Sequence, residues 1–139
     1  MRTDSKRWVE VTPSQFAHER AGLMTIRDLL PDGDPFRAWA NLECLGDDGS
    51  ANEVDLLVLA RNGLHLIELK HWQGRISGDA ATWLHNGRPV DNPLLLANRK
   101  AKRLRSLLER VARAKGSRAR VPFRPAGHAR LVAEERLLG

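Results

Sequence analysis

Apolar residues recur at helical spacing in two segments of the chain. The first segment follows Pro13, with Thr12 as the expected N-cap, and ends near Pro31. The second follows Pro93 and predicts a long helix capped by Asn92. The residues expected to form the buried stripe of this second helix are Leu94, Leu95, Leu104, Leu107, Leu108 and Val111.

Between these helices the pattern changes to short apolar runs separated by turn residues. Asn-Gly pairs at 62–63 and 86–87 are typical of tight turns. Strands are expected over residues 36–45, 54–60 and 64–70, followed by a shorter hairpin over residues 72–83. The order of helix, strands and helix predicts an α/β or α+β fold, in which helices flank a mixed β-sheet.

Three charged residues interrupt the apolar strands on either side of the first Asn-Gly turn: Asp55, Glu68 and Lys70. A charged group within a central strand is costly unless it is paired or bound to a metal ion. The chemistry of the chain is therefore expected at this hairpin. The alternative is structural: an ion pair between Asp55 and Lys70 joins the strands, and Glu68 lies in solvent.

The length of the loop determines which of these residues face one another. A loop of Arg61 and Asn62 places Asp55 opposite Glu68. A loop of Asn62 and Gly63 places Asp55 opposite Lys70, with Glu68 as a diagonal neighbour. Both registers place all three side chains on one face, with Cβ atoms about 5 Å apart for opposed residues and roughly 7–8 Å for diagonal ones. At either spacing two carboxylates can share one divalent cation.

The charge of the chain is divided between an acidic body and a basic end. Residues 1–97 contain 10 Lys and Arg against 14 Asp and Glu, whereas residues 98–139 contain 13 against 3. This division indicates a carboxylate site beside a surface that attracts polyanions. The residues of the second helix expected to contact nucleic-acid phosphates are Arg99, Lys100, Lys102 and Arg103. The alternative is a solvated helix surface.

Composition excludes several other classes of protein. The 139 residues are enough for one domain. The single cysteine, Cys44, excludes an internal disulfide and a cysteine-rich zinc site. The sequence has neither an apolar run of membrane-spanning length nor a signal-like N-terminus. We therefore expect a cytoplasmic protein without a membrane partner.

Several short motifs together resemble a known family. They are Asn52-Glu53-Val54-Asp55, Ile67-Glu68-Leu69-Lys70, Trp72-Gln73-Gly74, Trp83 and Asn92-Pro93. The combination resembles the NERD (nuclease-related) domain of the PD-(D/E)xK superfamily. The opening stretch from Arg7 to Ser14 is similar to the N-terminal NERD region of the large bacterial kinases of phage-growth-limitation (BREX-type) systems. The resemblance implies a restriction-endonuclease-like mixed sheet flanked by helices over residues 1–123, with an atypical basic tail over 124–139.

The resemblance also implies roles for individual residues. Asp55 and Glu68 would be ligands of Mg²⁺ or Mn²⁺, and Lys70 would orient or activate the attacking water. Glu19, on the first helix, would complete the acidic cluster, unless it is an ordinary exposed carboxylate. The implied function is metal-dependent hydrolysis of DNA, in phage defence or DNA processing. The alternatives are a non-catalytic module that binds DNA or protein, and a truncated fragment of a larger NERD-containing kinase, with a kinase as attached or partner effector.

Two segments depart from the family pattern. The run Leu94-Leu95-Leu96 stands where the family often has a polar residue, commonly Gln, early in the helix. Val121-Pro122-Phe123 resembles the start of a late strand, but residues 124–130 continue it poorly. A missing final strand would leave an exposed edge on the sheet.

Overall fold

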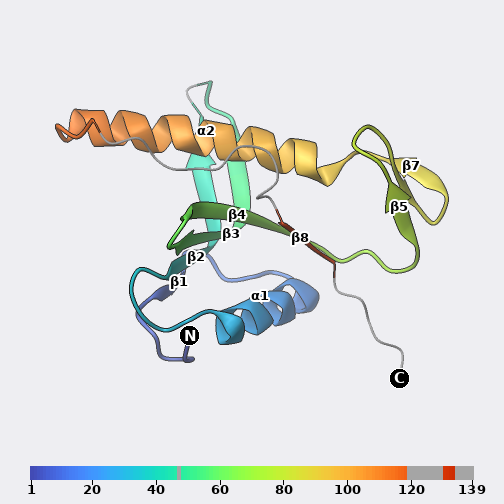
Figure 1. The fold of residues 1–139 in the computed structure, drawn as a ribbon, viewed down its shortest axis with the longest axis horizontal. Helices are drawn as coiled ribbons and strands as arrows, with labels where there is room; N and C mark the ends of the chain where they lie inside the picture. Colours follow the sequence, from blue (N-terminus) through green and yellow to red (C-terminus); the bar gives the residue numbers. More distant parts are fainter. Residues whose placement is uncertain (47, 119–129, 134–139) are drawn as a thin grey trace.

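The computed structural model describes residues 1–46, 48–118 and 130–133. Within these residues the chain forms two helices and eight strands (Figure 1). In chain order they are β1 (Trp8–Glu10), α1 (Ala17–Leu29), β2 (Arg37–Leu45), β3 (Ala51–Ala60), β4 (Gly63–Lys70), β5 (Ile76–Gly78), β6 (Trp83–His85), β7 (Arg88–Val90), α2 (Pro93–Ala114) and β8 (Arg130–Ala133).

The larger sheet is mixed and has the strand order β1-β2-β3-β4-β8. The three central strands are antiparallel, whereas β1 runs parallel to β2 and β8 runs parallel to β4. This arrangement confirms the expected restriction-endonuclease-like α/β fold. Neither outer strand was expected from the sequence. The expected late strand at 121–123 and the expected boundary after residue 123 lie outside the described residues.

The two helices cover opposite faces of the larger sheet (Figure 1). On one face, Leu23 of α1 is 1% exposed and packs against Leu56 and Val58 of β3. On the other face, Leu104 of α2 packs against Leu57. Alternate residues of β3 thus enter two cores, which explains why this strand is apolar on both faces.

The first helix begins later than the sequence indicates. Its first residue is Ala17 and its N-cap is Phe16, so the expected start at Thr12 and Pro13 is wrong. The segment before the helix is instead bound to β2, because the Asn41 side-chain amide donates hydrogen bonds to the Thr12 carbonyl (2.8 Å) and the Ser14 hydroxyl (2.9 Å). These tertiary contacts replace the local cap that the sequence suggested.

The start of the second helix is confirmed, but its buried stripe is narrower than expected. Leu104 is buried as expected and Ala97 is buried as well, whereas Leu95 is 52% exposed and Val111 is 44% exposed. The expectation for Leu95 and Val111 is therefore wrong. Leu95 comes two residues before the buried Ala97 and therefore lies on the opposite side of α2. The far end of the helix projects past the sheet (Figure 1).

Replacing Asn92 with Ala is expected to lower the free energy of unfolding by about 1 kcal/mol. The Asn92 side chain accepts a hydrogen bond from the Leu94 backbone N–H (2.9 Å), which has no partner within the helix. Urea denaturation measures the effect. The matched control is Asn98→Ala, inside the same helix, which should leave stability unchanged or slightly raised. Equal stability of Asn92→Ala and the wild type would contradict the role of the cap.

The smaller sheet consists of β5, β6 and β7 and confirms the expected hairpin after Trp72. The Trp72 ring stacks on His85 (5.3 Å between ring centroids) and meets Trp83 edge to face (6.3 Å). Trp72 thus anchors this sheet beside the end of β4. Neither α1 nor α2, the two helices of the described chain, has the length and apolar character needed to cross a membrane.

Candidate active site

The regular alternation of side chains is interrupted in strands β2 and β3, beside the β3–β4 hairpin that carries the three charged residues. Ala40 and Leu56 pair with each other and lie in the core against α1, whereas Leu42 and Val54 pair with each other and pack against α2. Residues two apart in a regular strand share a face. The regular alternation therefore breaks between these pairs, where Asn41 has a positive φ of 56° and Asp55 has no place in the pairing register.

The break brings the Asp55 carboxylate towards β4. Its Oδ2 accepts a hydrogen bond from the Leu69 backbone N–H at 2.7 Å. The pairing of Ala60 with Gly63 and of Leu56 with Ile67 shows that Arg61 and Asn62 form the hairpin loop. This is the first of the two registers considered, in which Asp55 and Glu68 are neighbours.

Glu68 is the buried carboxylate of the site, with 8% of its surface exposed. Burial is the main reason that its pKa rises from the usual 4.5 to about 7, and the neighbouring charge of Asp55 raises this pKa further. A hydrogen bond from the Lys100 ammonium, 2.8 Å from Oε1, acts in the opposite direction. The structural alternative of a solvated Glu68 is therefore wrong.

Glu19 approaches Asp55 from α1. It lines a cavity of about 160 Å³ together with Asp55, Glu53 and Phe16. Partial burial raises the pKa of Glu19, and the charge of Asp55 raises it further. The side chain is half-buried. Glu19 therefore lies beside Asp55, the carboxylate that the resemblance implied it would accompany.

Lys70 ends β4 close to the same place. It lines a mostly apolar hollow of about 280 Å³, which Glu19, His18 and His71 also line. Glu19 lines both this hollow and the cavity of Asp55, so the two concavities adjoin at Glu19. Asp55, in the middle of β3, therefore lies beside both Glu68 and Glu19, whereas Lys70, at the end of β4, shares a hollow with Glu19.

The four expected phosphate contacts on α2 divide into two kinds. Arg99, Lys102 and Arg103 are exposed. Lys100 is different, because its side chain is only 18% exposed and pairs with Glu68. The structure therefore places Lys100 with the carboxylates rather than with the exposed basic side chains. Sequence spacing contained a signal for this position, since Lys100 lies three residues after Ala97 and four before Leu104, both of which are buried.

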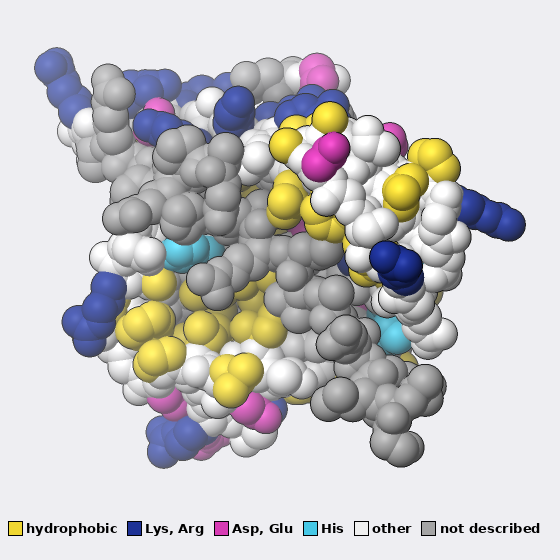
Figure 2. Space-filling model, turned by 45° about the vertical axis from the view of Figure 1, so that its right-hand side comes forward, with side chains coloured by type: hydrophobic (Ala, Val, Ile, Leu, Met, Phe, Trp, Pro, Cys, Tyr) yellow, Lys and Arg dark blue, Asp and Glu magenta, His cyan; other side chains and the backbone are white. Residues whose placement is uncertain are grey.

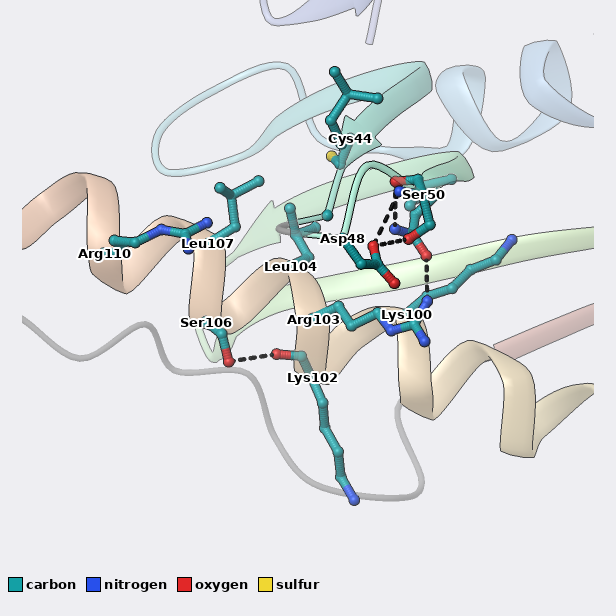
Figure 3. Close-up of a pocket in the computed structure, with 14 residues that line it drawn as sticks. Cys44, Asp48, Ser50, Lys100, Lys102, Arg103, Leu104, Ser106, Leu107 and Arg110 are labelled. Carbon is teal, nitrogen blue, oxygen red and sulfur yellow. Dashed lines mark hydrogen bonds between the residues drawn. The ribbon is translucent and has the colours of Figure 1, made fainter.

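A groove of about 380 Å³ lies between α2 and the turn that joins β2 to β3 (Figure 3). Four basic side chains line it: Lys100, Lys102, Arg103 and Arg110. Arg103 donates a hydrogen bond to the Asn52 side chain at the start of β3 (2.9 Å). Lys and Arg side chains also gather along the upper edge of the molecule in Figure 2, where Figure 1 shows α2. A basic surface therefore borders the carboxylates.

The donor atoms of Asp55 and Glu68 fit a hard divalent cation. Both offer carboxylate oxygens, and Mg²⁺ commonly binds one or two carboxylates while it keeps several waters. Among the residues that the structure describes, no group of three or more His, Cys, Asp or Glu side chains is arranged to hold a metal ion. A cation at this place would therefore depend on the Asp55 and Glu68 pair, and it would compete with Lys100 for Glu68.

A sequence profile of the NERD family, described as "Nuclease-related domain", matches residues 14–126. The chain belongs to this nuclease-related domain family. It is similar to a "Probable kinase PglW" of Streptomyces coelicolor, with 50% identity over 107 residues. The similar region is 73% of this chain but only 7% of that relative. No solved structure matches the chain significantly.

Proposed function

We propose that this domain hydrolyses phosphodiester bonds of DNA with the help of a divalent metal ion, Mg²⁺ or Mn²⁺. The observation that carries the proposal is the buried Glu68 carboxylate beside Asp55, within a nuclease-related fold. A buried carboxylate beside a second acidic group is costly unless a cation lies close to it, and here the Lys100 ammonium takes that place. Functional sites often retain such groups because their chemistry requires them.

The residues around this pair would have complementary roles. Asp55 and Glu68 would hold the cation, which when bound supplies a polarised phosphoryl oxygen and a water of lowered pKa. Asp55 is held in place by the Leu69 N–H. Lys70 would offset the negative charge that develops on the phosphate and orient the attacking water. Glu19 would contribute a further carboxylate to the site.

The basic groove would hold the phosphate backbone of the substrate. Arg99, Lys102 and Arg103 are exposed along α2, and phosphate contacts from such side chains bind without reading sequence. The groove and the carboxylate pair meet at Lys100, which lines the groove and contacts Glu68. DNA lying in the groove would therefore reach the carboxylates.

Replacing Arg99, Lys102 and Arg103 together with Gln is expected to weaken DNA binding and to flatten its salt dependence. Each lost phosphate contact lowers the slope of log K against log salt by about 0.9 for duplex DNA. Fluorescence anisotropy at several salt concentrations measures this slope. The control replaces three exposed basic residues elsewhere, Arg2, Lys6 and Arg61, with Gln. An equal change of slope in both variants would exclude a specific role of α2.

A second candidate function is binding without catalysis. The Lys100 ammonium already neutralises Glu68, so the site has a cation of its own. A domain of this kind would bind DNA or protein and would regulate an attached effector. The name of the Streptomyces relative suggests a kinase as that effector. The resemblance of the opening stretch to kinases of phage-growth-limitation systems suggests the setting.

Cleavage assays separate the two candidates. Plasmid and single-stranded DNA are incubated with the protein in Mg²⁺, in Mn²⁺ and in a chelator. The nuclease proposal expects cleavage in metal and none in the chelator. Salt-sensitive DNA binding with no cleavage under any condition would favour the binding module, and the absence of both activities would leave the truncated-fragment interpretation.

A further inference from the structure

Three aromatic rings form a continuous stack between α1 and the end of β4. The Phe16 and His18 ring centroids are 5.6 Å apart with an angle of 20° between the planes. The His18 and His71 centroids are 4.5 Å apart with an angle of 27°. Phe16 is the N-cap of α1, and His71 directly follows β4. Two elements far apart in the sequence therefore build one row of parallel rings.

The outer ring of this row is open to solvent. Phe16 is 57% exposed, and it is the only aromatic residue among the exposed large hydrophobic side chains of the described chain. The four tryptophans and Phe36 are all half-buried. An exposed apolar side chain is ordinary by itself, but this one extends a stack whose other two rings, His18 and His71, are also exposed.

The stack lies between the two concavities of the carboxylate site. Phe16 lines the cavity that contains Asp55, whereas His18 and His71 line the hollow that contains Lys70. Glu19 lines both. A flat ligand stacked on these rings would therefore lie directly beside the proposed catalytic residues.

We propose that the Phe16–His18–His71 stack binds an unpaired nucleobase, so that the domain prefers single-stranded nucleic acid to duplex. This inference rests on the proposed function and names its substrate class. Every base has a π face that stacks on aromatic side chains, with little dependence on sequence. In a duplex both faces of a base are covered by its neighbours. Lys70 lines the same hollow as two of the rings, and its positive charge would complement the phosphate that accompanies such a base.

Binding measured without metal tests the stack independently of cleavage. Fluorescein-labelled single-stranded DNA, RNA of the same sequence and duplex DNA are titrated with the full chain in a chelator. We expect tighter binding of single strands than of duplex. Phe16→Ala should weaken single-strand binding about tenfold and leave duplex binding unchanged, because stacking contributes about 1–3 kcal/mol per base. The DNA and RNA arms identify which strand the stack prefers.

Two further variants separate stacking from folding. Phe16→Trp should retain the wild-type affinity for single strands, because it keeps a π face at the same place. Leu95→Ala removes an exposed apolar side chain outside the site and should leave both binding affinities unchanged.

Equal binding of single strands and duplex by the wild type, or equal losses of affinity for both in Phe16→Ala, would overturn the inference. Metal-dependent cleavage without single-strand preference would overturn this inference alone, and single-strand binding without cleavage would overturn only the nuclease proposal.

Discussion

Replacing Glu68 with Gln is expected to lower the rate of metal-dependent DNA cleavage by about 100-fold or more. The substitution keeps the shape of the side chain and its ability to accept a hydrogen bond from Lys100, which is 2.8 Å away. It removes the negative charge that a Mg²⁺ or Mn²⁺ ion requires. Cleavage of plasmid DNA at saturating metal measures the rate, and circular dichroism verifies the fold.

The matched control is Glu109→Gln. Glu109 is also a carboxylate paired with a basic side chain of α2, since Arg105 lies 3.1 Å away. It lies nine residues beyond Lys100 on that helix, away from the residue that pairs with Glu68. Its replacement should leave cleavage unchanged. Full activity of Glu68→Gln, or an equal loss in both variants, would contradict the role of Glu68.

The second large effect concerns stability as a function of pH. Because the pKa of Glu68 is about 7 in the folded chain and 4.5 when unperturbed, the folded state holds a proton between these values that the unfolded state releases. The contribution of the Glu68 carboxyl to the stability of the folded state is fully present below pH 4.5 and is lost as pH rises through 7. The loss corresponds to about 3 kcal/mol of unfolding free energy.

Glu68→Gln removes this titration and isolates its contribution. Urea unfolding of the variant and the wild type is compared at pH 4.5 and at pH 8. The unfolding free energy of the variant minus that of the wild type should be about 3 kcal/mol larger at pH 8 than at pH 4.5. Glu109→Gln, a partly exposed ion pair, should change this difference by less than about 1 kcal/mol. A difference for Glu68→Gln that is independent of pH would show that the Glu68 carboxyl has an ordinary pKa.

Much of the hairpin could be predicted because its pattern is local. Turn residues and alternating apolar positions fixed the strands around Arg61 and Asn62 and limited the register to two choices. The structure selects the register in which Asp55 and Glu68 are neighbours. What periodicity could not predict is the break at Asn41 and Asp55, because it arises where two strands pair and depends on a positive φ in the partner strand.

The contacts between distant elements were harder to predict. Composition alone groups Lys100 with the exposed basic residues of the second helix, although its spacing from Ala97 and Leu104 places it towards the buried face. Its pairing with Glu68 depends on how α2 packs across the sheet. The strands β1 and β8 were likewise missed, since short outer strands are stabilised by their neighbours rather than by a pattern of their own.

Measurement of Mn²⁺ binding shows most directly whether Asp55 and Glu68 together hold a divalent cation. Electron paramagnetic resonance follows the signal of free Mn²⁺ as protein is added. We expect the wild type to bind the ion and Mg²⁺ to displace it, whereas Asp55→Asn and Glu68→Gln should each bind at least about tenfold more weakly. Lys70→Ala should bind as the wild type does. Absence of binding by the wild type, or equal binding by the wild type and both carboxylate variants, would show that Asp55 and Glu68 do not hold the ion.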